Sequence, residues 1–203
     1  MRIGLIPLSA KPYHAGHQAM VEKAAAENDQ VKVFVSLSDR TRRGEFPIKG
    51  SDMSRIWDEH LIAIMPPNVD VEYPHIPVRK VYEMLIEADR TGDSEIIYTV
   101  YSDPEDTQAN YPLANREKYF PTLYDEGLIQ FSAEVDPSSM TRGIGTPDVS
   151  GTKVREYLTQ KRPDLFIKSL PAGVDGQAIY DILIGSSSVE ESLLKDFVFA
   201  VMG

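Results

Sequence analysis

Residues 3–17 decide the fold, and they read IGLIPLSAKPYHAGH. The apolar first part, residues 3–8, predicts a buried β-strand. The polar part that follows places two histidines around Gly16 and leads into an Ala-rich segment, 17–26, that favours a helix. A strand, a tight turn and a helix in this order predict the first unit of a parallel α/β sheet. The turn then lies at the carboxyl edge of the sheet, where such sheets bind ligands.

The rest of the chain repeats this alternation. Apolar or β-branched runs predict strands at 31–35, 69–73, 96–101 and 128–133, and helical spacing predicts helices at 51–64, 77–91 and 150–160. The polar segment 102–115 and the segment 134–149 show no period. We therefore expect a Rossmann-like parallel sheet flanked by helices in residues 1–160. Residues 161–203 are expected to form a helical C-terminal extension of the same domain.

Composition excludes several classes of protein. The 203 residues include 42% hydrophobic and 26% charged residues, as in soluble globular domains. No apolar run approaches the roughly 18 residues of a membrane helix, and the start lacks the pattern of a signal peptide. The absence of cysteine excludes disulfides, thiolate nucleophiles and Cys zinc sites. These features predict a cytoplasmic protein without membrane contacts, and they leave open a homo-oligomer.

The net charge of −10 argues against binding to nucleic acid, because phosphate backbones are repelled at long range. A small anionic substrate still binds where positive charge is local. The early turn offers such a place, because helix N-termini present free N–H groups to phosphate. His14 and His17 lie three residues apart on one face of a helical turn, and Gly16 allows close approach. The alternatives are two histidines that cap a surface helix and a zinc pair, for which no third ligand is placed.

A second anion cradle is expected near residue 150, where the sequence reads VSGTKVR from Val149. Ser150 or Thr152 is expected to cap the new helix, so that hydroxyl and N–H groups form a seat for an anion. Arg155, one turn into the helix, can point back over that seat and bind phosphate. Taken alone, this pattern is also typical of an ordinary helix cap.

The two motifs together resemble those of the nucleotidylyltransferase superfamily, which has an early His-x-Gly-His turn and a late Ser-Ser/Gly-Thr-x-x-Arg turn. The resemblance covers about residues 1–160, and members include nicotinamide mononucleotide adenylyltransferases, pantetheine-phosphate adenylyltransferases and cytidylyltransferases. It implies a Rossmann-like fold and a reaction that joins an NTP to a phosphorylated acceptor with release of pyrophosphate. It also implies Mg²⁺ as the required ion, with no metal ligand assigned to a protein side chain.

The resemblance implies roles for individual residues. The expected catalytic residues are His14, His17 and Arg155. The expected nucleotide-binding residues are Ser9, Ala10, Lys11, Gly16, Ser150, Gly151, Thr152 and Arg142. The family commonly has Gly-x-Phe-[Asp/Asn] before the proline, where this chain has Leu8-Ser9-Ala10-Lys11. Arg155 stands where pantetheine-phosphate enzymes often carry Lys, which favours nicotinamide mononucleotide as acceptor, ATP as donor and NAD as product.

Residues that follow other strands are candidates for the acceptor. Arg40, Arg42, Arg43 and Lys49 lie in a polar loop after the second strand and can clamp a phosphate; the alternative is a solvated charged loop. Tyr101, Ser102 and Asp103 follow the fourth strand and can contact base or ribose, or can simply form a turn. Other functions remain open: a CTP-dependent cytidylyltransferase, a catalytically silent nucleotide sensor and a metal-dependent hydrolase.

Overall fold

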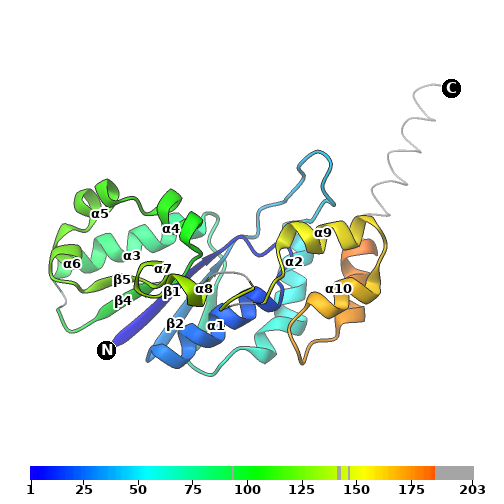
Figure 1. Ribbon diagram of the computed structural model, residues 1–203, viewed down its shortest axis with the longest axis horizontal. Coiled ribbons are helices and arrows are strands. Elements are labelled where there is room, and N and C mark those ends of the chain that lie inside the picture. The colour runs from blue at the N-terminus through cyan, green and yellow to red at the C-terminus, as the bar shows by residue number, and fades with distance from the viewer. Residues whose placement is uncertain (93, 141–142, 146, 186–203) are drawn as a thin grey trace. The chain divides into compact units, whose positions relative to one another are not determined.

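The computed structural model describes residues 1–92, 94–140, 143–145 and 147–185. Its sheet is parallel throughout and has the strand order β3-β2-β1-β4-β5 (Figure 1). The strands are β1 Arg2–Leu8, β2 Gln30–Val35, β3 Val69–Glu72, β4 Ile97–Val100 and β5 Ile129–Phe131. The expected Rossmann-like α/β fold is therefore confirmed. The switch in strand order falls between β1 and β4, and the early turn follows β1.

The contacts of the chain divide it into two compact units. Unit 1 contains residues 1–10, 15–36 and 65–149, and holds the whole sheet. Unit 2 contains residues 11–14, 37–64 and those from 150 on. The boundary inside the early turn falls between His14 and Ala15, so each half of the turn is described with its own unit. The expected division at residue 160 stays a prediction.

Strand β1 forms the centre of the sheet in unit 1. Leu5 is fully buried and pairs with Val100 of β4, which in turn pairs with Phe131 of β5. A strand with neighbours on both sides and helices on both faces exposes almost no side chain, so it is apolar without alternation. This explains why residues 3–8 form a continuous apolar run.

Two long helices of unit 1 pack against the strands from opposite sides (Figure 1). Helix α1, Ala15–Glu27, connects β1 to β2, and α3, Pro77–Thr91, connects β3 back to β4. Right-handed crossovers in opposite directions place such helices on opposite faces of the sheet. Helix α3 begins at Pro77 and ends before Gly92, whose φ of 68° only glycine adopts readily. Its expected boundaries are confirmed.

The segment after β4 is helical, although the polar sequence of 102–115 predicts no element there. It contains α4 Pro104–Asn110, α5 Leu113–Tyr119 and α6 Pro121–Asp125, and after β5 come α7 Ser132–Val135 and α8 Pro137–Met140. These helices are too short to show an apolar period. Asp103 caps α4 by accepting from the N–H of Asp106, and prolines begin α4 and α6. The Asp103 cap and the two prolines therefore set the starts of α4 and α6, where periodicity gives no signal.

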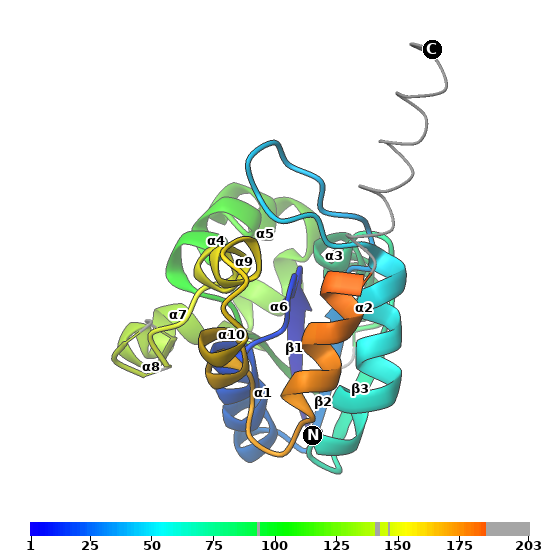
Figure 2. The same ribbon diagram turned by 90° about the vertical axis from the view of Figure 1, so that its right-hand side faces the viewer.

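Unit 2 is helical. It contains α2 Gly50–Ile56, a π-helical turn Trp57–Leu61, a 3₁₀ turn Ile62–Ile64, α9 Gly151–Thr159, α10 Pro163–Ser169 and a helix at 176–185. Figure 2 shows the last three in yellow and orange. Ser51, the first residue of the helix expected at 51–64, does not cap it. Lys49 is the N-cap residue, and the N–H of Gly50 donates to Asp39 Oδ1 at 2.8 Å. Residues 186–203 of the expected extension lie outside the described residues.

Candidate functional site

The first part of the early turn belongs to unit 2 and is buried. Lys11 and His14 are only 4% and 6% exposed. The Tyr13 ring meets the buried Trp57 ring edge to face, with centroids 4.9 Å apart. The Lys11 ammonium donates to Ser38 Oγ at 3.2 Å, and burial lowers the pKa of Lys11 below its ordinary value. A lysine ammonium group in such a place is suited to bind an anion.

The late motif begins α9 as expected. Ser150 is the N-cap residue, and its hydroxyl accepts from the N–H of Lys153 at 3.2 Å. Gly151 follows in a narrow space, because a Cβ built there would lie 3.0 Å from Arg155 Nη1 and 3.6 Å from the Lys11 carbonyl oxygen. Glycine therefore allows the helix start, the Arg155 side chain and the early loop to approach one another.

Arg155 connects the two motifs. Its Nη1 donates to the Lys11 carbonyl oxygen at 2.7 Å and its Nη2 donates to Thr152 Oγ1 at 3.0 Å. Its Nε lies 2.9 Å from Glu45 Oε2. The guanidinium is nearly buried, and this burial lowers the pKa of Arg155. Residues 144 positions apart thus meet in one cluster, which we call the arginine cluster: Lys11, Arg40, Glu45, Thr152 and Arg155.

The loop after β2 contributes Arg40 and Glu45. Arg40 Nε and Nη2 donate to the two carboxylate oxygens of Glu45 at 2.6 and 3.1 Å. This hydrogen bonding holds the pKa of Glu45 below its usual range. The carboxylate therefore bridges Arg40 and Arg155. Sequence reasoning missed Glu45; its signal was an acidic residue that follows three arginines of the same loop.

Unit 1 holds the other half of the early turn. Gly16 and His17 lie in the first turn of α1, at the carboxyl end of β1, and both are half-buried. Ser9 is exposed, and Ala10 is buried with a φ of 45°. A left-handed conformation is unfavourable for alanine, so the surrounding fold imposes this bend before the turn.

The structure uses Tyr101, Ser102 and Asp103 for internal contacts. The Tyr101 hydroxyl donates to Glu27 Oε2 and accepts from Asn28, both at 2.8 Å. Ser102 Oγ lies 2.7 Å from Thr107 Oγ1, and Asp103 is the cap of α4. Their polar groups thus stabilise the edge of the sheet, and acceptor binding by them stays a prediction.

The other basic candidates take different places. Arg42 and Arg43 are exposed in the loop after β2, whereas Arg142 lies outside the described residues. Among the described residues, no group of three or more His, Cys, Asp or Glu side chains is arranged to hold a metal ion. Within the same residues, no helix combines the length and the apolar character needed to cross a membrane.

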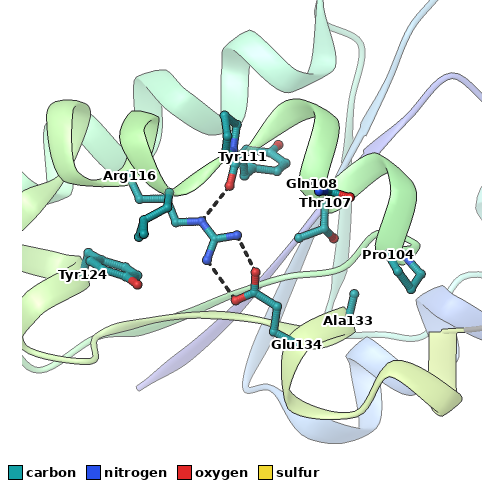
Figure 3. Close-up of a pocket in the computed structure, with 10 residues that line it drawn as sticks. Pro104, Thr107, Gln108, Tyr111, Arg116, Tyr124, Ala133 and Glu134 are labelled. Carbon is teal, nitrogen blue, oxygen red and sulfur yellow. Dashed lines mark hydrogen bonds and ion pairs between the residues drawn. The ribbon is translucent and has the colours of Figure 1, made fainter.

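A pocket of about 420 Å³ lies in unit 1 among α4, α5, α6 and α7 (Figure 3). Its wall includes Arg116, which donates to the Tyr111 carbonyl oxygen at 2.7 Å and to both oxygens of Glu134 at 2.6 and 2.8 Å. The guanidinium also lies 3.7 Å over the Phe131 ring. Arg116 of α5 therefore contacts the C-cap residue of α4, helix α7 and strand β5. No residue expected from the sequence to bind substrate lines this pocket.

The family model of the citrate lyase ligase C-terminal domain matches residues 3–49. This is a nucleotidyltransferase-related family. The matched residues include β1, both histidines of the early turn, α1, β2 and the loop with Arg40 and Glu45, and they end before α9. No curated protein matches the chain. Over these residues, the chain is similar to the C-terminal domain of citrate lyase ligase.

Proposed function

We propose that the protein is a nucleotidylyltransferase that transfers an NMP group from an NTP, with ATP favoured, to a small acceptor and releases pyrophosphate. The observation that carries the proposal is the guanidinium of Arg155, which joins the late helix start to the early loop. Arg155 thereby links the late helix start to the Lys11 end of the early loop, and both belong to unit 2. The similarity of residues 3–49 to a nucleotidyltransferase-related family supports the same class.

The chemistry needs positioning and charge rather than a protein nucleophile. An acceptor oxygen attacks the α-phosphorus in line, the bond from the α-phosphorus to the bridging oxygen breaks, and pyrophosphate leaves. Arg155 and Lys11 of unit 2 would bind the leaving phosphates. His17, at the start of α1, would donate a hydrogen bond to charge that develops in the transition state. Within the arginine cluster, the Glu45 carboxylate is paired with Arg40 and Arg155, and the other side chains offer guanidinium, ammonium and hydroxyl groups. Mg²⁺ would therefore be bound chiefly by the triphosphate.

The favoured acceptor is a phosphorylated mononucleotide, nicotinamide mononucleotide, which would give NAD. Similarity to a ligase domain favours a second class of acceptor, a carboxylate, because adenylyl transfer to a carboxylate is a common way to activate an acid for ligation. Transfer from CTP, and nucleotide binding without any transfer, are two further candidate functions.

The test is a pyrophosphate-release screen of ATP, CTP, GTP and UTP against phosphorylated and carboxylate acceptors, with Mg²⁺ present. Release that requires ATP and nicotinamide mononucleotide supports the favoured reaction. Release with a carboxylate assigns the ligase-type reaction, and release with CTP assigns a cytidylyltransferase. Nucleotide binding without release in any combination would reject transfer and leave a sensor.

A further inference from the structure

The Glu45 carboxylate lies between two guanidiniums that both suit phosphate. One oxygen accepts from Arg40 Nε at 2.6 Å and lies 2.9 Å from Arg155 Nε, while the other accepts from Arg40 Nη2 at 3.1 Å. Planar guanidiniums bind phosphate oxygens with the same donors that they offer to a carboxylate. Glu45 therefore occupies the position that a phosphate group would take between these two arginines.

Among the described residues Arg155 has three partners, and Glu45 is the one that can be exchanged. The Lys11 carbonyl belongs to the buried early loop, and Thr152 lies on the same helix as Arg155. The Glu45 side chain is 26% exposed, against 5% for Arg155, so water can reach and solvate it when it leaves. An incoming phosphate can thus displace Glu45 while the other two bonds keep the guanidinium in place.

The loop that carries Glu45 is anchored on both sides. Arg40 and Ile48 form an antiparallel bridge with backbone bonds of 2.8 and 3.0 Å, and both Phe46 and Ile48 are buried. Gly44, with a φ of 83°, makes the turn before Glu45. The backbone of the loop therefore holds Glu45 beside the two arginines. For a phosphate to replace the Glu45 carboxylate, only the end of the Glu45 side chain must move.

We infer that Arg40 and Arg155 form one seat for a condensed phosphate, which Glu45 fills until pyrophosphate or the β- and γ-phosphates of an NTP displace it. The inference rests on the proposed function for the nucleotide and extends it. The sequence predicted that Arg40 binds the acceptor, whereas this inference assigns Arg40 to the binding of the leaving phosphates. It also makes Glu45 a built-in competitor that weakens binding and favours pyrophosphate release.

The experiment titrates inorganic pyrophosphate into the purified full chain by calorimetry. Glu45→Gln keeps the size of the side chain but removes its charge, so affinity should rise about tenfold, the value of one charge-assisted contact. Arg40→Gln should lower affinity by a similar factor of about ten. Glu59→Gln is the matched control, because Glu59 also pairs with an arginine of unit 2, Arg55 at 2.8 Å, and should leave affinity unchanged. Thermal unfolding checks each variant, and Glu45→Ala replaces Glu45→Gln if the latter does not fold.

Each departure from this pattern overturns the seat. Weaker binding by the Glu45 variants would show that the carboxylate positions the arginines for the ligand, and unchanged binding would show that it does not compete. Unchanged binding by Arg40→Gln would remove Arg40 from the seat. The pyrophosphate-release screen distinguishes the two proposals. If the variants bind pyrophosphate as expected but no NTP is turned over, the proposed transfer reaction is rejected and the phosphate seat stands. If NTP is turned over but Glu45→Gln does not change pyrophosphate affinity, the phosphate seat is rejected and the transfer reaction stands.

Discussion

The Arg155 guanidinium contacts a carbonyl, a hydroxyl and a carboxylate, so we expect it to contribute to stability as well as to the proposed binding of phosphate. Arg155→Lys keeps the charge but loses the planar fork, so it cannot keep all three contacts. We expect a loss of about 1–3 kcal/mol in the free energy of unfolding. We also expect a rise of about tenfold in KM for NTP.

Denaturant unfolding and pyrophosphate-release kinetics measure these two effects. Arg162→Lys is the control, since the exposed pair of Arg162 with Asp164 should contribute little to stability. Unchanged stability together with an unchanged KM would remove Arg155 from both roles.

Replacing His17 tests the proposed catalytic step more directly than replacing Arg155. If it stabilises the transition state, His17→Ala should lower kcat by about 10²–10³ with little change in NTP affinity. His75→Ala is the control, because His75 is exposed and stands outside the early turn. Steady-state pyrophosphate release under saturating NTP measures the effect. If the kcat of His17→Ala stays within about threefold of the parent value, His17 does not stabilise the transition state.

At the scale of elements, the start of α9 has a structural cap and is also the proposed place for phosphate. Ser150→Ala removes the bond to the Lys153 N–H and should cost about 1 kcal/mol of stability. Ser150→Asp keeps a side-chain cap and should retain most of that stability. Its negative charge should nevertheless weaken NTP binding, because it opposes phosphate at the same helix end.

Urea denaturation and calorimetry separate the two effects of residue 150. Residue 150 acts both as a helix cap and as part of a phosphate-binding helix start only if Ser150→Ala lowers stability and Ser150→Asp lowers NTP affinity. An aspartate variant that binds NTP like the parent would leave Ser150 as a cap alone.

Elements with a period were predictable, and elements set by local caps were not. Helix α3 shows apolar residues at helical spacing between Pro77 and Gly92, and both ends were correct. Helices α4 to α6 have five or seven residues each, too few for a period, and depend on Asp103 and on helix-starting prolines. The start of α9 was predictable because a serine cap is recognisable in the sequence, and Ser150 is the N-cap residue as expected. Glu45 was not, because its position depends on the Arg40–Ile48 bridge.

At the scale of the whole molecule, charge makes the basic loop informative. A chain with a net charge of −10 repels anionic substrates at a distance, whereas Arg42 and Arg43 are exposed in a loop that also carries Arg40. If this pair clamps the acceptor, replacing both with Gln should raise KM for the acceptor more than KM for NTP. The difference should shrink as salt screens exposed charges.

Kinetics at low and at physiological ionic strength measure the effect of the double replacement. An equal rise in both constants would indicate a general loss of electrostatic steering. No change in either constant would leave the pair as solvated surface charge.

The bond from Arg155 to the Lys11 carbonyl has a consequence for evolution. A carbonyl oxygen is present whatever the side chain, so residue 11 can change among related proteins without losing this partner. Arg40 and Glu45, in contrast, recognise each other through their side chains. Substitutions of Arg40 and Glu45 should therefore be correlated among homologues. Substitutions of Lys11 and Arg155 should be independent of each other, although the two residues are in contact.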